Sequence, residues 1–78
     1  MGIDVIHIDP QILGGTPVFR GTRVPVEGLF SHLENGISID EFLEEFPSVM
    51  REQVIAVLEI AEKMTTSKKL KSLYESAA

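Results

Sequence analysis

The chain has 78 residues and a mass of 8.6 kDa, enough for one small domain, and its 44% hydrophobic content is typical of a folded protein. It has no cysteine, only two histidines and no apolar run long enough to cross a membrane, so we expect a cytoplasmic protein without disulfides, a metal, a cofactor or a membrane span. A chain this small and without those supports is expected to gain stability from a partner chain.

Charge is divided unevenly along the chain, whose net charge is −5. Residues 1–26 are neutral overall, because two aspartates balance Arg20 and Arg23. Residues 27–62 carry nine acidic side chains against Arg51 alone, a net charge of −8, whereas residues 63–78 carry four lysines and one glutamate, a net charge of +3. The acidic middle would repel a phosphate backbone, so any contact with nucleic acid is expected from the N-terminal arginines or the lysine tail.

Residues 1–25 are predicted to form an arm of short strands. Ile3 to Ile8 has β-branched residues at four of its six positions, which is typical of a strand, and Asp9-Pro10 ends it. Gly14-Gly15 predicts a turn with positive φ, because glycine adopts that conformation at little cost. Further extended runs are expected at residues 16–19 and 23–24, with a second turn at residues 20–22.

From Val26 onward, the apolar period changes from 2 to 3.6 and predicts three helices. The first is expected to end at Asn35-Gly36, and the second to start with a capping box in which Ser38 and Glu41 bond to each other's backbone. Pro47 ends the second helix. The third is expected to be capped by Ser48 and to run to about Met64. Its predicted buried stripe consists of Met50, Val54, Val57, Leu58, Ala61 and Met64.

The third predicted helix has a wider apolar arc than one core-facing stripe needs. Ile55 and Ile60 fall outside the stripe, and a wide arc faces either a larger core or a second subunit. We favour a second subunit, and therefore expect a homodimer made by the arm and the third helix, with Val5, Ile55 and Ile60 as interface candidates.

The fold class expected from these elements is mainly α: a β arm at residues 1–25, a three-helix domain at residues 26–64 and a basic tail at residues 65–78. Three helices joined by short turns resemble helix-turn-helix and homeodomain-like DNA readers. In that arrangement the start of the third helix offers Arg51 and Gln53 to DNA, beside Arg20 and Arg23 of the arm.

The string GGTPVFRGTRVPV at Gly14 to Val26, followed by the NGIS turn and IDEFLEEFP, resembles a bacterial family catalogued as domain of unknown function 433. The resemblance covers about Ile3 to Met64. It implies a β arm, a homeodomain-like helical unit and dimers. Members of this family resemble VapB-type antitoxins encoded beside a PIN-like nuclease toxin, so it also implies DNA and such a toxin as partners. The basic tail after Met64 lies outside the shared region.

Two features allow more than one interpretation. Arg20 and Arg23 can contact DNA, or they can pair with Asp4, Asp9 or Glu27 and lock the arm to the helices. The tail is either a frayed terminus or a segment that folds on a partner. Its candidate partner-binding residues are Lys68, Lys69, Leu70, Lys71, Leu73 and Tyr74.

The function predicted from the sequence is an antitoxin-like, DNA-binding regulatory homodimer. The alternative is a protein-interaction adaptor with no role in nucleic-acid binding. We do not expect an enzyme, because no serine lies beside a partnered base and no set of carboxylates or histidines has the spacing of a catalytic or metal site.

Overall fold

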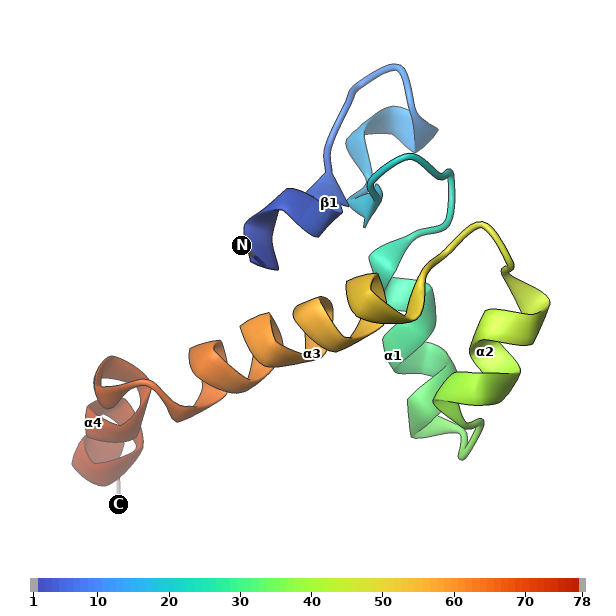
Figure 1. Cartoon of the computed structure of the whole chain (residues 1–78). Coiled ribbons are helices and arrows are strands. Elements are labelled where there is room, and N and C mark those ends of the chain that lie inside the picture. Colours follow the sequence, from blue (N-terminus) through green and yellow to red (C-terminus); the bar gives the residue numbers. More distant parts are fainter. Residues whose placement is uncertain (1, 78) are drawn as a thin grey trace.

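A computed structural model describes residues 2–77 and shows a mainly helical chain with a small β arm at one end (Figure 1). In chain order the elements are η1 (Gly2–Val5), β1 (Ile6–His7), η2 (Leu13–Gly15), β2 (Val18–Phe19), α1 (Val26–Glu34), α2 (Ile39–Glu45), α3 (Arg51–Thr66) and α4 (Lys68–Ala77), where η marks a 3-10 helix.

The first strand is much shorter than predicted. The segment Gly2–Val5 forms a 3-10 helix, and only Ile6–His7 pairs with the antiparallel strand Val18–Phe19. The prediction of a strand from residue 3 is wrong because the carbonyls of this segment find other partners. The backbone amide of Arg20 donates to the carbonyl of Val5 at 2.8 Å. The Arg20 guanidinium donates to the carbonyls on either side of it, those of Asp4 and Ile6. As a 3-10 turn, η1 packs against α3 and brings Val5 onto the core.

The glycine turn of the arm has the predicted backbone conformation. Gly14 and Gly15 have φ values of 66° and 95°, and Leu13 before them also has a positive φ, 50°. A side chain at either glycine would meet no neighbouring atom within 4 Å, so the need for glycine lies in the backbone angles.

The helices α1 and α2 begin and end at the signals that predict them. The C-cap of α1 is Asn35, followed by Gly36 with a φ of 80°. At the start of α2, the Glu41 amide donates to the Ser38 hydroxyl at 3.1 Å, and the Ser38 amide donates to the Glu41 carboxylate at 2.9 Å. The reciprocal bonds confirm the capping box, and the backbone amide of Ser38 lowers the pKa of Glu41 below its usual value.

The start of α3 differs from the prediction. The helix begins at Arg51, and its N-cap is Met50 instead of Ser48; the Met50 amide donates to the side-chain carbonyl of Gln53 at 2.9 Å. The reason lies in Val49, which is only 4% exposed and must turn into the core before the helix starts. Met50 then falls outside the helix and is 61% exposed, so its predicted burial is wrong.

The core collects residues from the arm and from the first three α-helices. Phe19, Leu29, Phe42 and Val54 are fully buried, and the rings of Phe19 and Phe42 pack with their centroids 6.1 Å apart. The remaining buried core residues are Val26, Val49 and Val57, with Val18 buried beside Phe19 in β2. The arm is therefore part of the hydrophobic core, not an appendage.

The tail forms a fourth α-helix, so the three-helix description is incomplete. The third helix continues past its predicted end at Met64 to Thr66, and only Ser67 separates it from α4. Beyond the core, α3 runs away from the other helices (Figure 1). Met64 lies in this projecting part and is 69% exposed, so its predicted burial is also wrong.

No helix within residues 2–77 combines the length and apolar character needed to cross a bilayer.

A histidine joins α1 to α2. The two ring nitrogens of His32 lie 2.6 Å from the carbonyl oxygen of Gly28 and 3.1 Å from the carboxylate of Glu45. Both partners are acceptors, so both contacts are satisfied only when both nitrogens carry a proton. The Gly28 carbonyl, and then Glu45, raise the pKa of His32 above 6.5. The ring also meets Phe42 and Phe46 edge-on, at centroid distances of 5.2 and 5.6 Å.

This arrangement predicts a pH-dependent free energy of unfolding. A pKa raised by folding adds stability that is complete below the unfolded pKa, about 6.5, and is lost as the pH rises through the higher folded pKa. We expect the wild-type protein to be more stable at about pH 5.5 than at about pH 8, and His32→Gln to lose most of this difference. Urea unfolding at both pH values measures it, with His7→Gln as the control. A difference that survives in His32→Gln would contradict the assignment.

Candidate functional site

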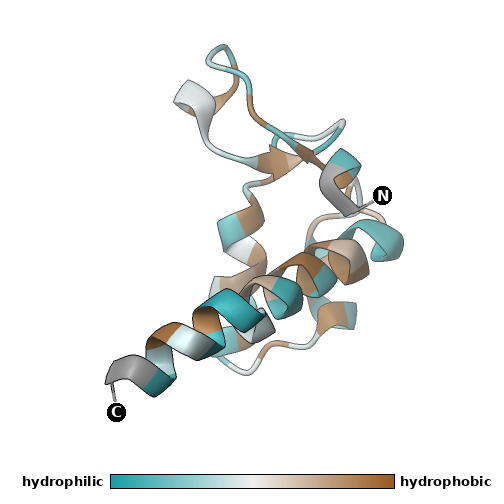
Figure 2. Cartoon of the chain, turned by 90° about the vertical axis from the view of Figure 1, so that its left-hand side faces the viewer, coloured by the Kyte–Doolittle hydropathy of each residue, from teal (hydrophilic) through white to brown (hydrophobic). Residues whose placement is uncertain are grey.

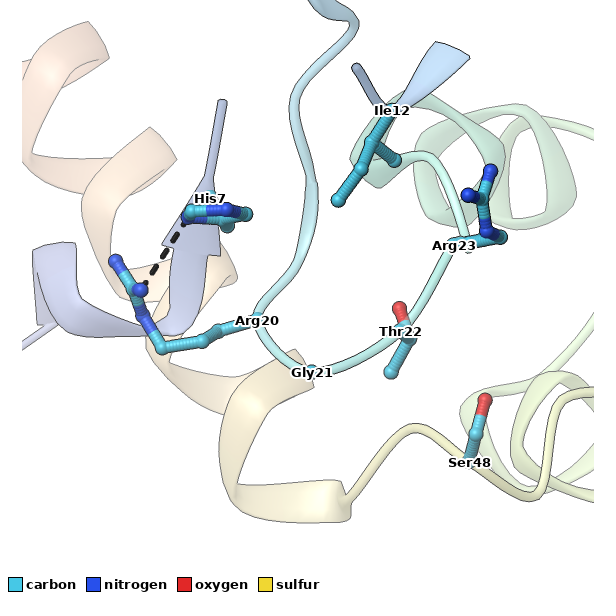
Figure 3. A pocket seen from close by; sticks show the side chains of 7 residues that line it. All are labelled: His7, Ile12, Arg20, Gly21, Thr22, Arg23 and Ser48. Carbon is cyan, nitrogen blue, oxygen red and sulfur yellow. Dashed lines mark hydrogen bonds between the residues drawn. The ribbon is translucent and has the colours of Figure 1, made fainter. Parts of the chain in front are cut away.

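An open hollow of about 650 Å³ surrounds the turn between Arg20 and Arg23. Its lining comes from β1, the loop before η2, the turn after β2 and the turn before α3 (Figure 3). The lining residues are His7, Ile12, Arg20, Gly21, Thr22, Arg23 and Ser48. The structure thus brings together the two arginines of the RGTR motif and a serine from more than twenty positions further along the chain.

The turn that carries the arginines is internally hydrogen-bonded. The Thr22 hydroxyl donates to the Phe19 carbonyl at 2.8 Å and accepts from the Val24 amide at 3.0 Å. Gly21 has a φ of 81°, a conformation that glycine adopts most easily. The two hydrogen bonds of the Thr22 hydroxyl therefore fix the backbone of the turn that carries Arg20 and Arg23.

Arg20 holds the first residues of the arm in place. Its Nε donates to the Asp4 carbonyl at 2.5 Å, its Nη2 donates to the Ile6 carbonyl at 3.1 Å, and its Nη1 lies 3.3 Å from Nδ1 of His7. Because a guanidinium only donates, Nδ1 of His7 is the acceptor in this contact. The Arg20 side chain therefore bonds within the arm, to backbone carbonyls and His7, and not to the carboxylates of Asp4, Asp9 or Glu27 that the sequence offered as partners.

Gln53 and Arg51, the other two candidates for DNA contact, also bond within the protein. The Gln53 side-chain amide donates to the carbonyl of Arg20 at 3.0 Å, while its oxygen accepts from the Met50 amide. Gln53 therefore caps α3 and fastens it to the arm at the same time. The Arg51 guanidinium forms an ion pair with Asp40 at the start of α2.

Arg23 differs from the other three candidates. It is exposed, and within residues 2–77 its side chain has no hydrogen bond or ion pair. Figure 3 shows Arg20 and Arg23 on opposite sides of Gly21, with only Arg20 directed at His7. The hydroxyl of Ser48, which also lines the hollow, is similarly without a protein partner among these residues. The hollow thus offers one guanidinium and one hydroxyl to a ligand, a combination suited to an anionic group.

The structural contacts of this site lie between residues far apart in the chain, which is why the sequence did not reveal them. Gln53 and Arg20 are separated by 33 positions, and Arg20 and Asp4 by 16. Neither spacing matches a helical or strand period, so pattern analysis has no signal for either bond. Among residues 2–77, no group of three or more histidine or acidic side chains is placed to hold a metal ion.

The tail candidates lie on α4, and the interface candidates lie on α3 and at the end of η1. Leu73 and Tyr74 are 61% and 72% exposed, while Leu70 is half-buried. The three tail lysines are all exposed. Among the interface candidates, Ile55 is 42% exposed, whereas Val5 packs on the core and Ile60 is half-buried. A second subunit would therefore find Ile55 and α4 more accessible than Val5.

Comparing the two arginines of the turn tests their different roles. We expect Arg20→Ala to lower the free energy of unfolding by about 1–2 kcal/mol, because it leaves two backbone carbonyls without their partner at an exposed edge. Amide hydrogen exchange at residues 2–7 should also become faster. Arg23→Ala, the matched control, should stay within about 0.5 kcal/mol of the wild-type protein. Equal stability and exchange in the two variants would contradict the structural role of Arg20.

Residues 6–61 match the family model described as "Protein of unknown function (DUF433)", and the chain belongs to this family. Its match covers the arm from β1 onward and most of α3, and excludes α4.

The chain is similar to two further proteins. One is the uncharacterized protein y4eO of Sinorhizobium fredii, which is 43% identical over 51 residues; this match covers 65% of the present chain and 23% of that protein. The other is the crystal structure of a DUF433 member from Anabaena variabilis, with a TM-score of 0.65 and 25% identity, covering 87% of this chain and 65% of the other. The chain thus spans under a quarter of the curated relative's length and under two thirds of the solved structure's.

Proposed function

We propose that this member of the DUF433 family is an antitoxin-like regulatory protein of the cytoplasm that is a homodimer when free and binds a protein partner through α4. The observation that carries the proposal is the projection of α3 and α4 away from the core. Leu73 and Tyr74 are largely exposed on α4, among lysines, although the remainder of the chain is acidic. An exposed apolar stripe with charges around it is typical of an interaction helix.

The partner that we propose is a PIN-like nuclease, as the resemblance to VapB-type antitoxins implies. In this proposal α1, α2 and α3 form the homeodomain-like unit, and α4 is the segment added for the partner. The position of α4 beyond the part shared with the family supports this division, because a segment outside the shared fold can differ from member to member. We propose binding and no catalysis, because Arg20 and Thr22 at the hollow are occupied by structural bonds, as is Gln53 in the first turn of α3.

Titration of a PIN-like nuclease encoded beside this gene tests the proposal. We expect Leu73→Asp to weaken binding at least roughly tenfold, because a charge replaces an apolar contact at the centre of the stripe. Met50→Asp changes an equally exposed apolar residue on the body of the protein and should bind like the wild type. Equal binding by both variants, or no binding by the wild-type protein, would contradict the proposed role of α4.

DNA binding is the second candidate function, and Arg23 at the hollow is the observation that favours it. Its guanidinium is exposed without a protein partner among residues 2–77, and the Ser48 hydroxyl lines the same hollow, so each is available to an anionic group such as a phosphate. Arg20, Arg51 and Gln53 are less available, because they bond within the protein. The acidic middle of the chain, residues 27–62, would oppose extensive contact with a duplex.

A gel-shift assay with the DNA upstream of the gene, at about 150 mM salt, tests this candidate. We expect Arg23→Ala to weaken binding roughly tenfold and to reduce the slope of log K against log salt by about one, the effect of losing one phosphate contact. Arg51→Ala is the control, because its partner in the protein is Asp40. Unchanged DNA binding by Arg23→Ala would show that the arm does not contact DNA. If the wild-type protein gives no gel shift, the alternative of a protein-interaction adaptor without nucleic-acid binding is favoured.

A further inference from the structure

The helix α4 has an apolar stripe bordered by lysines on both sides. At 3.6 residues per turn, Leu70, Leu73 and Tyr74 fall on one face, and Lys69 and Lys71 flank this face to either side. Lys68 lies on the opposite face of the helix. We call the apolar stripe with its two flanking lysines the α4 stripe. It matches a surface with an apolar centre and acidic borders.

The outer face of α3 has this complementary pattern. Ile55 is 42% exposed, and the exposed Glu52, Glu59 and Glu62 lie on the same side of the helix. We call these four residues the α3 outer face. The exposed Arg51 lies on this side too, but its guanidinium is paired with Asp40. Figure 2 shows hydrophilic and hydrophobic residues side by side along α3 and α4. From Glu52 to Glu62 the helix rises about 15 Å, the same as the length of the ten-residue α4.

The two complementary surfaces cannot meet within one chain. Only Ser67 lies between α3 and α4, whereas helices that pack antiparallel need a connection of two or more residues. In the structure α4 turns aside at the far end of α3 (Figure 1). The α4 stripe of one copy can therefore reach the α3 outer face only of another copy.

We propose that, in the free protein, the α4 stripe of each copy lies along the α3 outer face of the other copy. The contact is reciprocal, so two copies form a closed dimer with two identical interfaces. This inference rests on the homodimer of the proposed function and names its interface. It also means that the dimer covers Leu73 and Tyr74 until a protein partner displaces the second copy.

Charge reversal tests the pairing directly. The Lys69→Glu/Lys71→Glu variant places acids against acids in its own dimer, and Glu59→Lys/Glu62→Lys places bases against bases. We expect each variant alone to raise the dimer Kd at least roughly tenfold, because like charges then face each other across the contact. Mixed in equal amounts, they should form a heterodimer with a Kd within about threefold of the wild-type value, since both of its contacts again join opposite charges.

Analytical ultracentrifugation measures these dimers, and Lys68→Glu is the matched control. Lys68 lies on the opposite face of α4, so its reversal should leave the dimer unchanged. If both double variants remain dimeric, the homodimer stands and the proposed interface is wrong. If the wild-type protein is monomeric throughout, both are wrong. If the mixture of the two variants stays monomeric, the pairing of these lysines with these glutamates is wrong.

Cysteine crosslinking provides an independent measurement, because the chain has no cysteine of its own. A chain with Ile55→Cys, mixed with a chain carrying Leu73→Cys, should form a disulfide-linked heterodimer on oxidation, since the two side chains face each other in the proposed dimer. Met50→Cys replaces Ile55→Cys in the control mixture and should give several-fold less product. Equal crosslinking in both mixtures would contradict the proposal.

Discussion

The hydrogen bonds of Arg20 hold the arm and the helices together as one unit. Its guanidinium donates to carbonyls of η1 and β1, and its own carbonyl accepts from Gln53 at the start of α3. Three segments from different parts of the chain therefore depend on one residue. The core depends on the same link, because Phe19, next to Arg20, is buried against Phe42 only while β2 stays beside the helices. In a domain with so small a core, such a polar link contributes a large share of the net stability.

The elements predicted correctly are those whose signals lie within a few residues. The capping box of Ser38 and Glu41, and the stop at Asn35-Gly36, depend on neighbours three or four positions away, and the structure has both. The start of α3 could not be predicted in this way. Ser48 and Gln53 are both credible capping residues, and the burial of Val49, a property of the whole fold, decides between them.

The roles of the residues at the candidate site are also decided by contacts between distant parts of the chain. In the sequence Arg20 and Arg23 are equivalent, since both flank the same Gly-Thr turn and neither has a partner at a regular spacing. In the fold Arg20 becomes a structural residue and Arg23 remains available at an open hollow. Their difference arises from the carbonyls of η1 and β1, which accept hydrogen bonds from the side chain of Arg20. No local sequence pattern indicates which of the two arginines bonds within the protein and which remains available to a ligand.

Ser67, the single residue between α3 and α4, is a hinge between the two projecting helices. Ser67 has an extended backbone, with φ of −66° and ψ of 155°, and its hydroxyl accepts from the Leu70 amide at the start of α4. The φ and ψ angles of Ser67 therefore set the direction of the ten-residue helix α4 relative to α3. A change at these angles would swing α4 through a wide arc without disturbing a single buried side chain, so the geometry with which the tail meets another molecule can be adjusted independently of the stability of the domain.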